Sequence, residues 1–195
     1  MFTGIIEEIG KVVSIEKEQS NIHFTLKASM SNELKVDQSL AHNGCCLTVV
    51  KKDKSCYTVT AIQETLDKTN LEDWMIGSSI NLERCMKADG RFDGHIVQGH
   101  VDCTAICTDI QEQDGSWAFF FSYEADHITV DKGSITVNGT SLTVVDSKEK
   151  EFSVCIIPYT YENTTFQNLK KGSVINLEFD VLGKYIQKYL SKLRS

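Results

Sequence analysis

Two short segments of the sequence carry residues that could do chemistry on a small molecule. Cys46 and Ser141 each stand two residues after an Asn-Gly pair and two residues before a threonine, Thr48 and Thr143. On a strand this spacing puts the thiol or hydroxyl and the threonine on one face. A cysteine is the better nucleophile unless the serine has a base. The Asn-Gly pairs are explained by turn chemistry alone, but two polar positions inside a core strand are not.

Two histidines lie close together in the middle of the chain. His95 and His100, with Cys103 and Cys107, have ligand types that metals use. On a strand, however, His100 faces away from His95 and Cys103, and the three residues of the same parity, His95, Cys103 and Cys107, would stretch across roughly 40 Å. We therefore predict no metal site, and we interpret the cysteines as small buried hydrophobic residues. His100 follows Gly99, where a ligand could approach the backbone closely. The ordinary alternative is a hydrogen-bonded histidine without a catalytic role.

The second half of the chain repeats the first at a constant offset of 95 residues. From residue 39 to 83, 17 of 45 positions are identical to those of 134–178. A period this long is typical of two copies of one small domain rather than of a solenoid. The copies differ where chemistry could take place: Cys46 aligns with Ser141, and His100 aligns with Ile5.

The composition excludes several classes of protein. The chain has 195 residues and a net charge of −7, which argues against nucleic acid as a partner. The start of the sequence resembles neither a signal peptide nor a membrane span, so we expect no membrane partner. Seven cysteines without a disulfide-like spacing indicate a reducing compartment, and we predict a cytoplasmic protein.

Short, partly alternating apolar stretches predict an all-β fold. They cover 10–15, 22–27, 47–50, 57–62, 78–83, 104–110, 117–122, 142–145, 152–157 and 173–179. Five or six strands per half favour closed antiparallel barrels, which leave no exposed edge. Each half also has one short helical candidate, at 63–71 and 158–166. We predict an N-terminal barrel over 1–95, a C-terminal barrel over 96–180 and a helix over 181–195.

The final segment has an apolar stripe without a counterpart in the first copy. It consists of Val181, Leu182, Tyr185, Ile186, Tyr189 and Leu190, which recur at helical spacing. A basic cluster of Lys184, Lys188, Lys192 and Arg194 fits a solvated helix face. An amphipathic helix of this length needs a partner surface. That surface is either its own barrel or another subunit, and the sequence leaves both open.

Several motifs together resemble the riboflavin synthase family over the whole chain. They are Met1–Ile6, Ala41–Val49, Glu64–Leu66, Asp93–Asp102 and Val137–Val144. The resemblance implies two homologous six-stranded Greek-key barrels with a C-terminal helix, assembled as a homotrimer. It also implies that two molecules of 6,7-dimethyl-8-ribityllumazine exchange a four-carbon unit, giving riboflavin and 5-amino-6-ribitylamino-2,4-pyrimidinedione. No metal or organic cofactor is implied, and a surrounding shell of lumazine synthase is left open.

The resemblance also implies the site residues, shared between the N-terminal barrel of one subunit and the C-terminal barrel of its neighbour. Transferred by position, the N-terminal pocket contains Gly4, Ile5, Ile6, Ser39, Cys46, Leu47, Thr48, Thr60, Ala61, Ile62, Gln63, Glu64 and Thr65. The C-terminal pocket contains Gly99, His100, Val101, Lys132, Ser141, Leu142, Thr143, Ile156, Ile157, Pro158, Tyr159, Thr160 and Tyr161. The candidate catalytic residues are Cys46, His100, Ser141, Thr143 and Ser39. His100 is the candidate for proton transfer, because histidine is the side chain that most often acts as a general acid or base.

Two departures from the family pattern and one rival function accompany this resemblance. Many members have Pro-Glu-Thr-Leu where this chain has Pro158-Tyr159-Thr160-Tyr161, and some have Asp at the position of Asn138. The rival is a lumazine protein, a non-catalytic relative that carries a lumazine or flavin as a fluorophore. Such relatives tend to lose the Gly-His and second-copy features, whereas this chain keeps Cys46, His95, His100, Ser141 and Thr143. The enzyme is therefore our leading interpretation.

Overall fold

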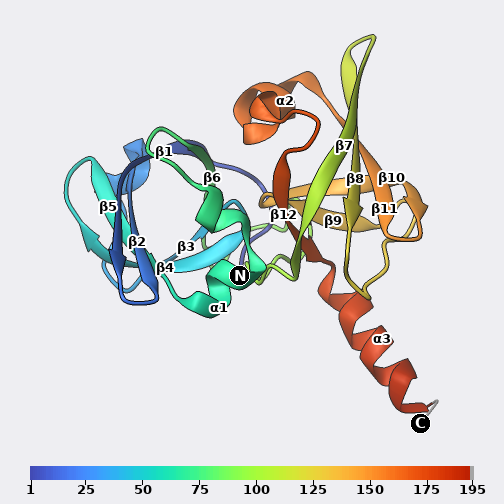
Figure 1. Ribbon diagram of the computed structural model, residues 1–195, viewed down its shortest axis with the longest axis horizontal. Coiled ribbons are helices and arrows are strands. Elements are labelled where there is room, and N and C mark those ends of the chain that lie inside the picture. Colours follow the sequence, from blue (N-terminus) through green and yellow to red (C-terminus); the bar gives the residue numbers. More distant parts are fainter. Residues whose placement is uncertain (194–195) are drawn as a thin grey trace.

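The computed structural model describes residues 1–193 and shows two closed six-stranded antiparallel barrels side by side (Figure 1). The first barrel consists of β1 (Glu8–Glu18), β2 (Asn21–Lys27), β3 (Ser39–His42), β4 (Cys45–Lys52), β5 (Cys56–Ala61) and β6 (Ser79–Arg84). The second consists of β7 (Cys103–Gln113), β8 (Ser116–Tyr123), β9 (Ser134–Val137), β10 (Thr140–Lys148), β11 (Glu151–Ile156) and β12 (Val174–Phe179). The predicted fold class is confirmed.

The strand order is the same Greek-key arrangement in both copies. The first barrel closes as β1-β2-β5-β4-β3-β6, so β5 lies beside β2 and β3 lies beside β6. Bulges interrupt β1 between Val12 and Ser14 and β7 between Cys107 and Asp109, which are equivalent positions. Such bulges bend and twist a strand, which helps a short sheet to close on itself. The repeat in the sequence is thus a repeat of the whole topology.

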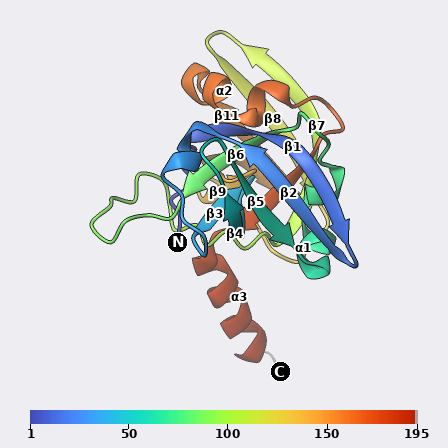
Figure 2. The same cartoon turned by 90° about the vertical axis from the view of Figure 1, so that its left-hand side faces the viewer.

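Three α-helices and three 3₁₀ turns complete the described chain. They are α1 (Gln63–Lys68), α2 (Pro158–Asn163) and α3 (Val181–Leu193), with 3₁₀ turns at Ser29–Asn32, Asn70–Asp73 and Thr165–Asn168. Each predicted helical candidate of the two copies therefore contains a short α-helix and runs into a 3₁₀ turn. The helix α3 projects away from both barrels in Figures 1 and 2. The last two residues of the predicted C-terminal helix, 194–195, lie outside the described residues.

Each barrel has its own apolar core. Phe24, Leu26 and Leu82 are among the fully buried residues of the first core. The second core is richer in aromatic side chains, and Phe119 packs edge-to-face on Phe166 with ring centroids 5.0 Å apart. The hydrophobic burial that stabilises the fold is therefore divided between two separate cores.

The two barrels are related by a pseudo-twofold axis, and four buried asparagines lie close to this axis at their interface. The Asn81 side chain donates to the backbone carbonyl of Asn138 at 2.8 Å, and the equivalent Asn176 side chain donates to the carbonyl of Asn43 at 2.9 Å. Gly44 and Gly139 face each other at this axis, where a Cβ added to Gly44 would lie 2.8 Å from the Gly139 nitrogen. Glycine is required here because the two backbones touch.

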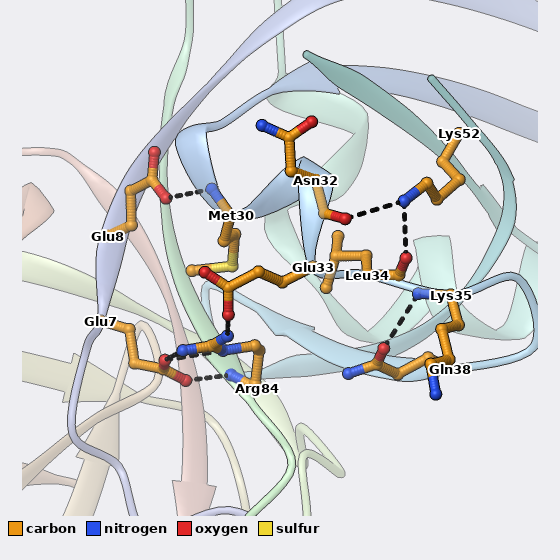
Figure 3. A network of polar contacts seen from close by, with 10 residues as sticks. All are labelled: Glu7, Glu8, Met30, Asn32, Glu33, Leu34, Lys35, Gln38, Lys52 and Arg84. Carbon is orange, nitrogen blue, oxygen red and sulfur yellow. Dashed lines mark hydrogen bonds and ion pairs between the residues drawn. The ribbon is translucent and has the colours of Figure 1, made fainter. Parts of the chain in front are cut away.

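A polar network joins the last strand of the first barrel to the segment before its first strand (Figure 3). Two guanidinium nitrogens of Arg84 donate to the carboxylate of Glu7 at 2.6 and 2.8 Å, and a third donates to Glu33. The Arg84 backbone N–H also donates to Glu7 at 2.7 Å. Glu7 follows residues 4–6 directly, so this network fixes the direction in which those residues leave the first barrel.

Candidate functional site

The Asn-Gly pairs form the tight turns that lead into β4 and β10. Asn43 and Gly44 have φ angles of 45° and 80°, and Asn138 and Gly139 have φ angles of 44° and 80°. Two successive positive φ angles are the signature of a type I′ hairpin turn. After the first turn, Leu47 points into the core while Cys46 and Thr48 face outward, as predicted. The turn therefore sets the register that presents the thiol on the barrel surface.

The segment that begins each copy reaches across to the other copy. The carbonyl of Gly4 accepts a hydrogen bond from the Ser141 N–H at 2.8 Å, and the carbonyl of Gly99 accepts one from the Cys46 N–H at 2.9 Å. Val101 likewise packs against the core of the first barrel. The grouping implied by the resemblance, with residues 4–6 beside Cys46 and residues 99–101 beside Ser141, is therefore wrong within one chain.

Two equivalent glutamates hold these crossing segments in place. The Glu83 carboxylate accepts the backbone N–H groups of Thr3 and Gly4 at 2.7 and 3.0 Å. The Glu178 carboxylate accepts those of Gln98, Gly99 and His100 at 2.8, 3.0 and 3.1 Å. Burial raises the pKa of the Glu178 carboxyl to about 7, and it also raises the pKa of Glu83.

These glutamates were not among the sequence candidates. The signal that could have found them is the identical Ile-Asn-Leu-Glu that ends each copy, at residues 80–83 and 175–178. An ionisable residue at the end of an otherwise apolar strand needs donors nearby if it is buried. The backbone N–H groups of the crossing segments are those donors, which is why the same glutamate occurs in both copies.

The first pocket is a cavity of about 240 Å³ at the outer face of β4. Its walls come from β4, from α1 and from the crossing segment, and they include Cys46, Glu64, Thr65, Lys68, Gly99, His100 and Val101. Burial raises the pKa of the Cys46 thiol, so the sulfur stays protonated at neutral pH. His100 is exposed at the edge of this pocket. The pocket thus combines a neutral thiol with an accessible imidazole.

The second site is centred on Ser141, at the equivalent place on β10. Ser141 Oγ lies 2.7 Å from Nδ1 of His95, and Nε2 of the same ring lies 3.1 Å from Oγ1 of Thr136. Burial lowers the pKa of His95, so the ring is neutral at neutral pH. His95 was considered as a metal ligand in the sequence but not as a residue of this site. The Gly-His motif contained it, but nothing in its spacing indicated Ser141 as a partner.

Comparison with known proteins identifies the family. The model of the lumazine binding domain matches this chain twice, over residues 3–85 and 98–180. The chain is 41% identical to riboflavin synthase of Actinobacillus pleuropneumoniae, with 98% of this chain and 91% of the relative covered. It is 42% identical to riboflavin synthase of Bacillus subtilis (strain 168), with the same coverage. The chain belongs to the riboflavin synthase family.

Solved structures show the same fold at lower identity. The structure of LumP complexed with riboflavin superposes with a TM-score of 0.85 at 21% identity, covering 92% of this chain and all of that one. LumP complexed with 6,7-dimethyl-8-(1'-D-ribityl) lumazine gives a TM-score of 0.84 at 20% identity, covering 92% of this chain and 99% of that one. These likenesses establish the pair of barrels, while membership of the riboflavin synthase family rests on the closer relatives.

The remaining candidates implied by the riboflavin synthase resemblance fall into two groups. Leu47, Ala61 and Ile156 have side chains buried in the cores, so they can offer a ligand only backbone groups. The others are at least partly exposed, on strands, on the short helices or in the segments that connect them: Ile5, Ile6, Ser39, Thr48, Thr60, Ile62, Gln63, Glu64, Thr65, Lys132, Leu142, Thr143, Ile157, Pro158, Tyr159, Thr160 and Tyr161. The positions equivalent to one another in the two copies lie at equivalent places in the two barrels.

Some of these side chains already have partners within the chain. The Thr60 hydroxyl contacts Nδ1 of His23 at 2.8 Å, and Tyr161 stacks on Trp117 with ring centroids 4.0 Å apart. Ile62 and Ile157, at the starts of α1 and α2, are instead 52% and 60% exposed. This matched pair of isoleucines offers an exposed apolar surface at equivalent places in the two copies.

Two further features bear on binding. Among residues 1–193 the structure has no group of three or more histidine, cysteine or acidic side chains arranged to hold a metal ion. Over the same part of the chain, none of the helices is long and apolar enough to cross a membrane.

Proposed function

We propose that this protein is a riboflavin synthase that transfers a four-carbon unit between two molecules of 6,7-dimethyl-8-ribityllumazine. The products are riboflavin and 5-amino-6-ribitylamino-2,4-pyrimidinedione. The observation that carries this proposal is the pair of pseudo-symmetric sites with different chemical groups, Cys46 with His100 and Ser141 with His95. Two identical substrates need similar sites, and their different roles need chemically different ones.

Substrate binding follows from the shape of each site. Backbone groups of residues 60–65 and 156–161 lie at the start of the short helices and are proposed to hydrogen-bond the pyrimidine edge of each lumazine. Hydroxyl groups on the outer faces of the barrels, such as Thr48 and Thr143, are proposed to hold the ribityl chains. The crossing segments then close each site with the backbone of the other copy, through residues 99–101 in the first and 4–6 in the second.

The chemistry begins with removal of a proton from the C7 methyl group of one lumazine. The heteroaromatic ring stabilises the resulting carbanion, so a base of modest strength is enough. His100 is the proposed proton acceptor because it is exposed at the wall of the first pocket, next to Cys46. Holding two rings at reacting distance can supply up to about 7–11 kcal/mol of the barrier reduction.

The protein is proposed to act as a homotrimer in which the first pocket of one subunit faces the second site of its neighbour. The support is the apolar stripe of α3, where Leu182, Tyr185, Ile186 and Tyr189 are 60–75% exposed. Such a stripe in water favours association. We further propose a cytoplasmic location, supported by the seven free cysteines.

A single incubation tests the proposed activity. The purified protein is mixed with 6,7-dimethyl-8-ribityllumazine as the only substrate, and riboflavin is followed by chromatography and fluorescence. A riboflavin synthase forms riboflavin with each turnover. A protein that binds the lumazine and leaves it unchanged is a carrier, and that result would refute the proposal.

A further inference from the structure

Three side chains of the second site form a continuous hydrogen-bonded network. Ser141 on β10 and Thr136 on β9 are directly opposite each other in the sheet. The ring of His95 spans this cross-strand pair, with Nδ1 2.7 Å from Ser141 Oγ and Nε2 3.1 Å from Thr136 Oγ1. The His95 backbone N–H donates to the carbonyl of Thr3 at 3.1 Å, which fixes the ring over the pair.

The first pocket does not repeat this hydrogen-bonded network around its reactive residue. The pair equivalent to Ser141 and Thr136 is Cys46 and Ala41, which also face each other in the sheet. In the first pocket, the side chain that hydrogen-bonds the Cys46 thiol is Ser39 rather than a histidine. The Ser141 hydroxyl is thus hydrogen-bonded to an imidazole, whereas the Cys46 thiol contacts Ser39 and shares its pocket with the exposed His100. This is the difference expected of two nucleophiles, since a serine needs a base far more than a cysteine does.

The protonation state of the ring selects the direction of these hydrogen bonds. A neutral imidazole has one acceptor nitrogen and one donor nitrogen, and burial keeps His95 neutral by lowering its pKa. The shorter contact, to Ser141, fits a hydroxyl that donates to Nδ1. The Nε2–H group then donates to Thr136, whose oxygen orients the ring. This is the arrangement of a nucleophile, a base and a group that positions the base.

We propose that His95 is the base for Ser141, and that the second site holds the lumazine to which a nucleophile adds at C7. The bond from Oγ to C7 forms while the Oγ–H bond breaks. The proton passes to Nδ1 of His95, and the π-electron pair at C7 moves into the conjugated ring system as a delocalised anion. Return of the proton from His95 and cleavage of the same bond later regenerate Ser141. The assignment rests on the proposed function, and it gives the first pocket, with His100, the lumazine that loses its methyl proton.

A double-mutant cycle in the full-length protein tests this pair. His95→Gln and Ser141→Ala are each expected to lower kcat about 100-fold or more, as loss of a general base does. The double variant is expected to be no slower than the slower single variant, because either change disables the same unit. Riboflavin titration by fluorescence is expected to show affinities within about threefold of the wild type for all three variants, since neither side chain is proposed to hold the ligand.

A thiol variant distinguishes a base from a merely structural residue, because only a base should matter less for turnover when the nucleophile is a thiol. In the Ser141→Cys background, His95→Gln is expected to cost about tenfold or less, because a thiol depends less on a base. The matched control is Thr25→Ala, which removes a hydroxyl from another directly paired cross-strand contact, to Thr58 at 2.9 Å, and is expected to leave turnover unchanged.

The outcomes separate the two proposals. A wild-type protein that forms no riboflavin refutes the proposed function. If the wild type is active, full activity of His95→Gln overturns the role of His95. Losses that multiply in the double variant, or an equal loss from His95→Gln in the Ser141→Cys background, also overturn it. Loss of riboflavin binding in His95→Gln would show that the histidine only shapes the site.

Discussion

The backbone N–H of Cys46 donates a hydrogen bond to the carbonyl of Gly99 at 2.9 Å, although the two residues belong to different copies of the repeat. The symmetric contact joins the Ser141 N–H to the carbonyl of Gly4 at 2.8 Å. Each copy therefore completes the site of the other. The duplication in this protein is thus more than two independent binding domains on one chain, because residues of each half complete the site of the other.

Gly99→Ala tests this crossing directly. Gly99 has a φ of 80°, and an added Cβ would lie 2.6 Å from the Cβ of Cys46 and 2.8 Å from the ring of Phe2. We expect loss of ligand binding in the first pocket and a drop in unfolding free energy. The matched control is Gly115→Ala, which has the same φ of 80° but nothing within 4 Å of the added atom.

The two glycine variants should differ by the steric overlap alone. Gly115→Ala is expected to cost about 1–2 kcal/mol from its left-handed backbone. Gly99→Ala is expected to cost a further ~1–3 kcal/mol from overpacking. Urea unfolding and riboflavin titration measure both effects. Equal stability and equal ligand affinity of the two variants would contradict the contact between Gly99 and Cys46.

Cys46→Ser is expected to lower kcat about tenfold or more while leaving the fold intact, because the thiol lines the first pocket beside the proposed proton acceptor His100. The equivalent position already carries Ser141, so a serine fits this place on the strand. Cys56→Ser, at the start of β5 and outside the pocket, is the control and should keep its turnover. The lumazine assay and circular dichroism compare the two. Wild-type turnover by Cys46→Ser would remove the thiol from the mechanism.

Glu178 should make stability depend on pH. Burial raises the pKa of this carboxyl from 4.5 to about 7, so the folded state binds its proton more tightly than the unfolded state. The resulting stabilisation is fully present below pH 4.5 and is lost as the pH rises through 7. It is at most about 3 kcal/mol.

Urea unfolding at pH 5 and pH 8 can isolate this contribution. We expect the wild type to lose more unfolding free energy over this interval than Glu178→Gln, which cannot titrate at this position. Glu83, whose pKa is also raised, remains in both proteins and cancels in the difference. Parallel pH dependence of the two proteins would mean that the three N–H donors keep Glu178 ionised throughout.

Removing residues 183–195 is expected to give monomers with little activity, because the apolar stripe of α3 loses its partner and the shared site opens. The single change Ile186→Asp, on the stripe, should act in the same way, whereas Lys188→Asp, on the polar face, should not. Size-exclusion chromatography combined with the lumazine assay tests all three. A fully active monomer would refute the shared site.

The isolated first half, residues 1–95, is expected to fold and to bind riboflavin without catalysis. It retains Cys46, Thr48 and residues 60–65 but lacks residues 97–101, which close the first pocket. We therefore expect binding only when two fragments pair around Gly44, so that residues 2–6 of each replace the missing segment of the other. His100 would still be absent, with Ile5 in its place. Circular dichroism, fluorescence titration and light scattering test this, and a folded monomer that binds riboflavin tightly would contradict the crossing.

The architecture could be predicted because its signals are local. Alternating apolar residues marked ten of the twelve strands, and the Asn-Gly turns placed Cys46 and Thr48 on one face. The two missed strands, β3 and β9, have four residues each, too few for an alternation pattern to stand out. Both lie inside the repeated motif, immediately before its turn.

The site was harder to predict because its contacts are not local. The offset of 95 residues shows that Gly4 and Gly99 are equivalent, but it cannot show which barrel each one touches. The sequence repeat is the same whether the segment that begins each copy packs on its own barrel or on the other one. His95 was missed for a similar reason, because its partner Ser141 lies 46 residues away and nothing in the spacing links them.

The mass balance of the lumazine reaction tests the central claim most directly. Purified full-length protein is incubated with 6,7-dimethyl-8-ribityllumazine alone, and substrate and both products are quantified over time. Transfer of a four-carbon unit from one lumazine to another requires that two lumazines disappear for each riboflavin and each 5-amino-6-ribitylamino-2,4-pyrimidinedione formed. Lumazine that stays bound and unchanged, or riboflavin formed without an equal amount of the pyrimidinedione, would contradict it.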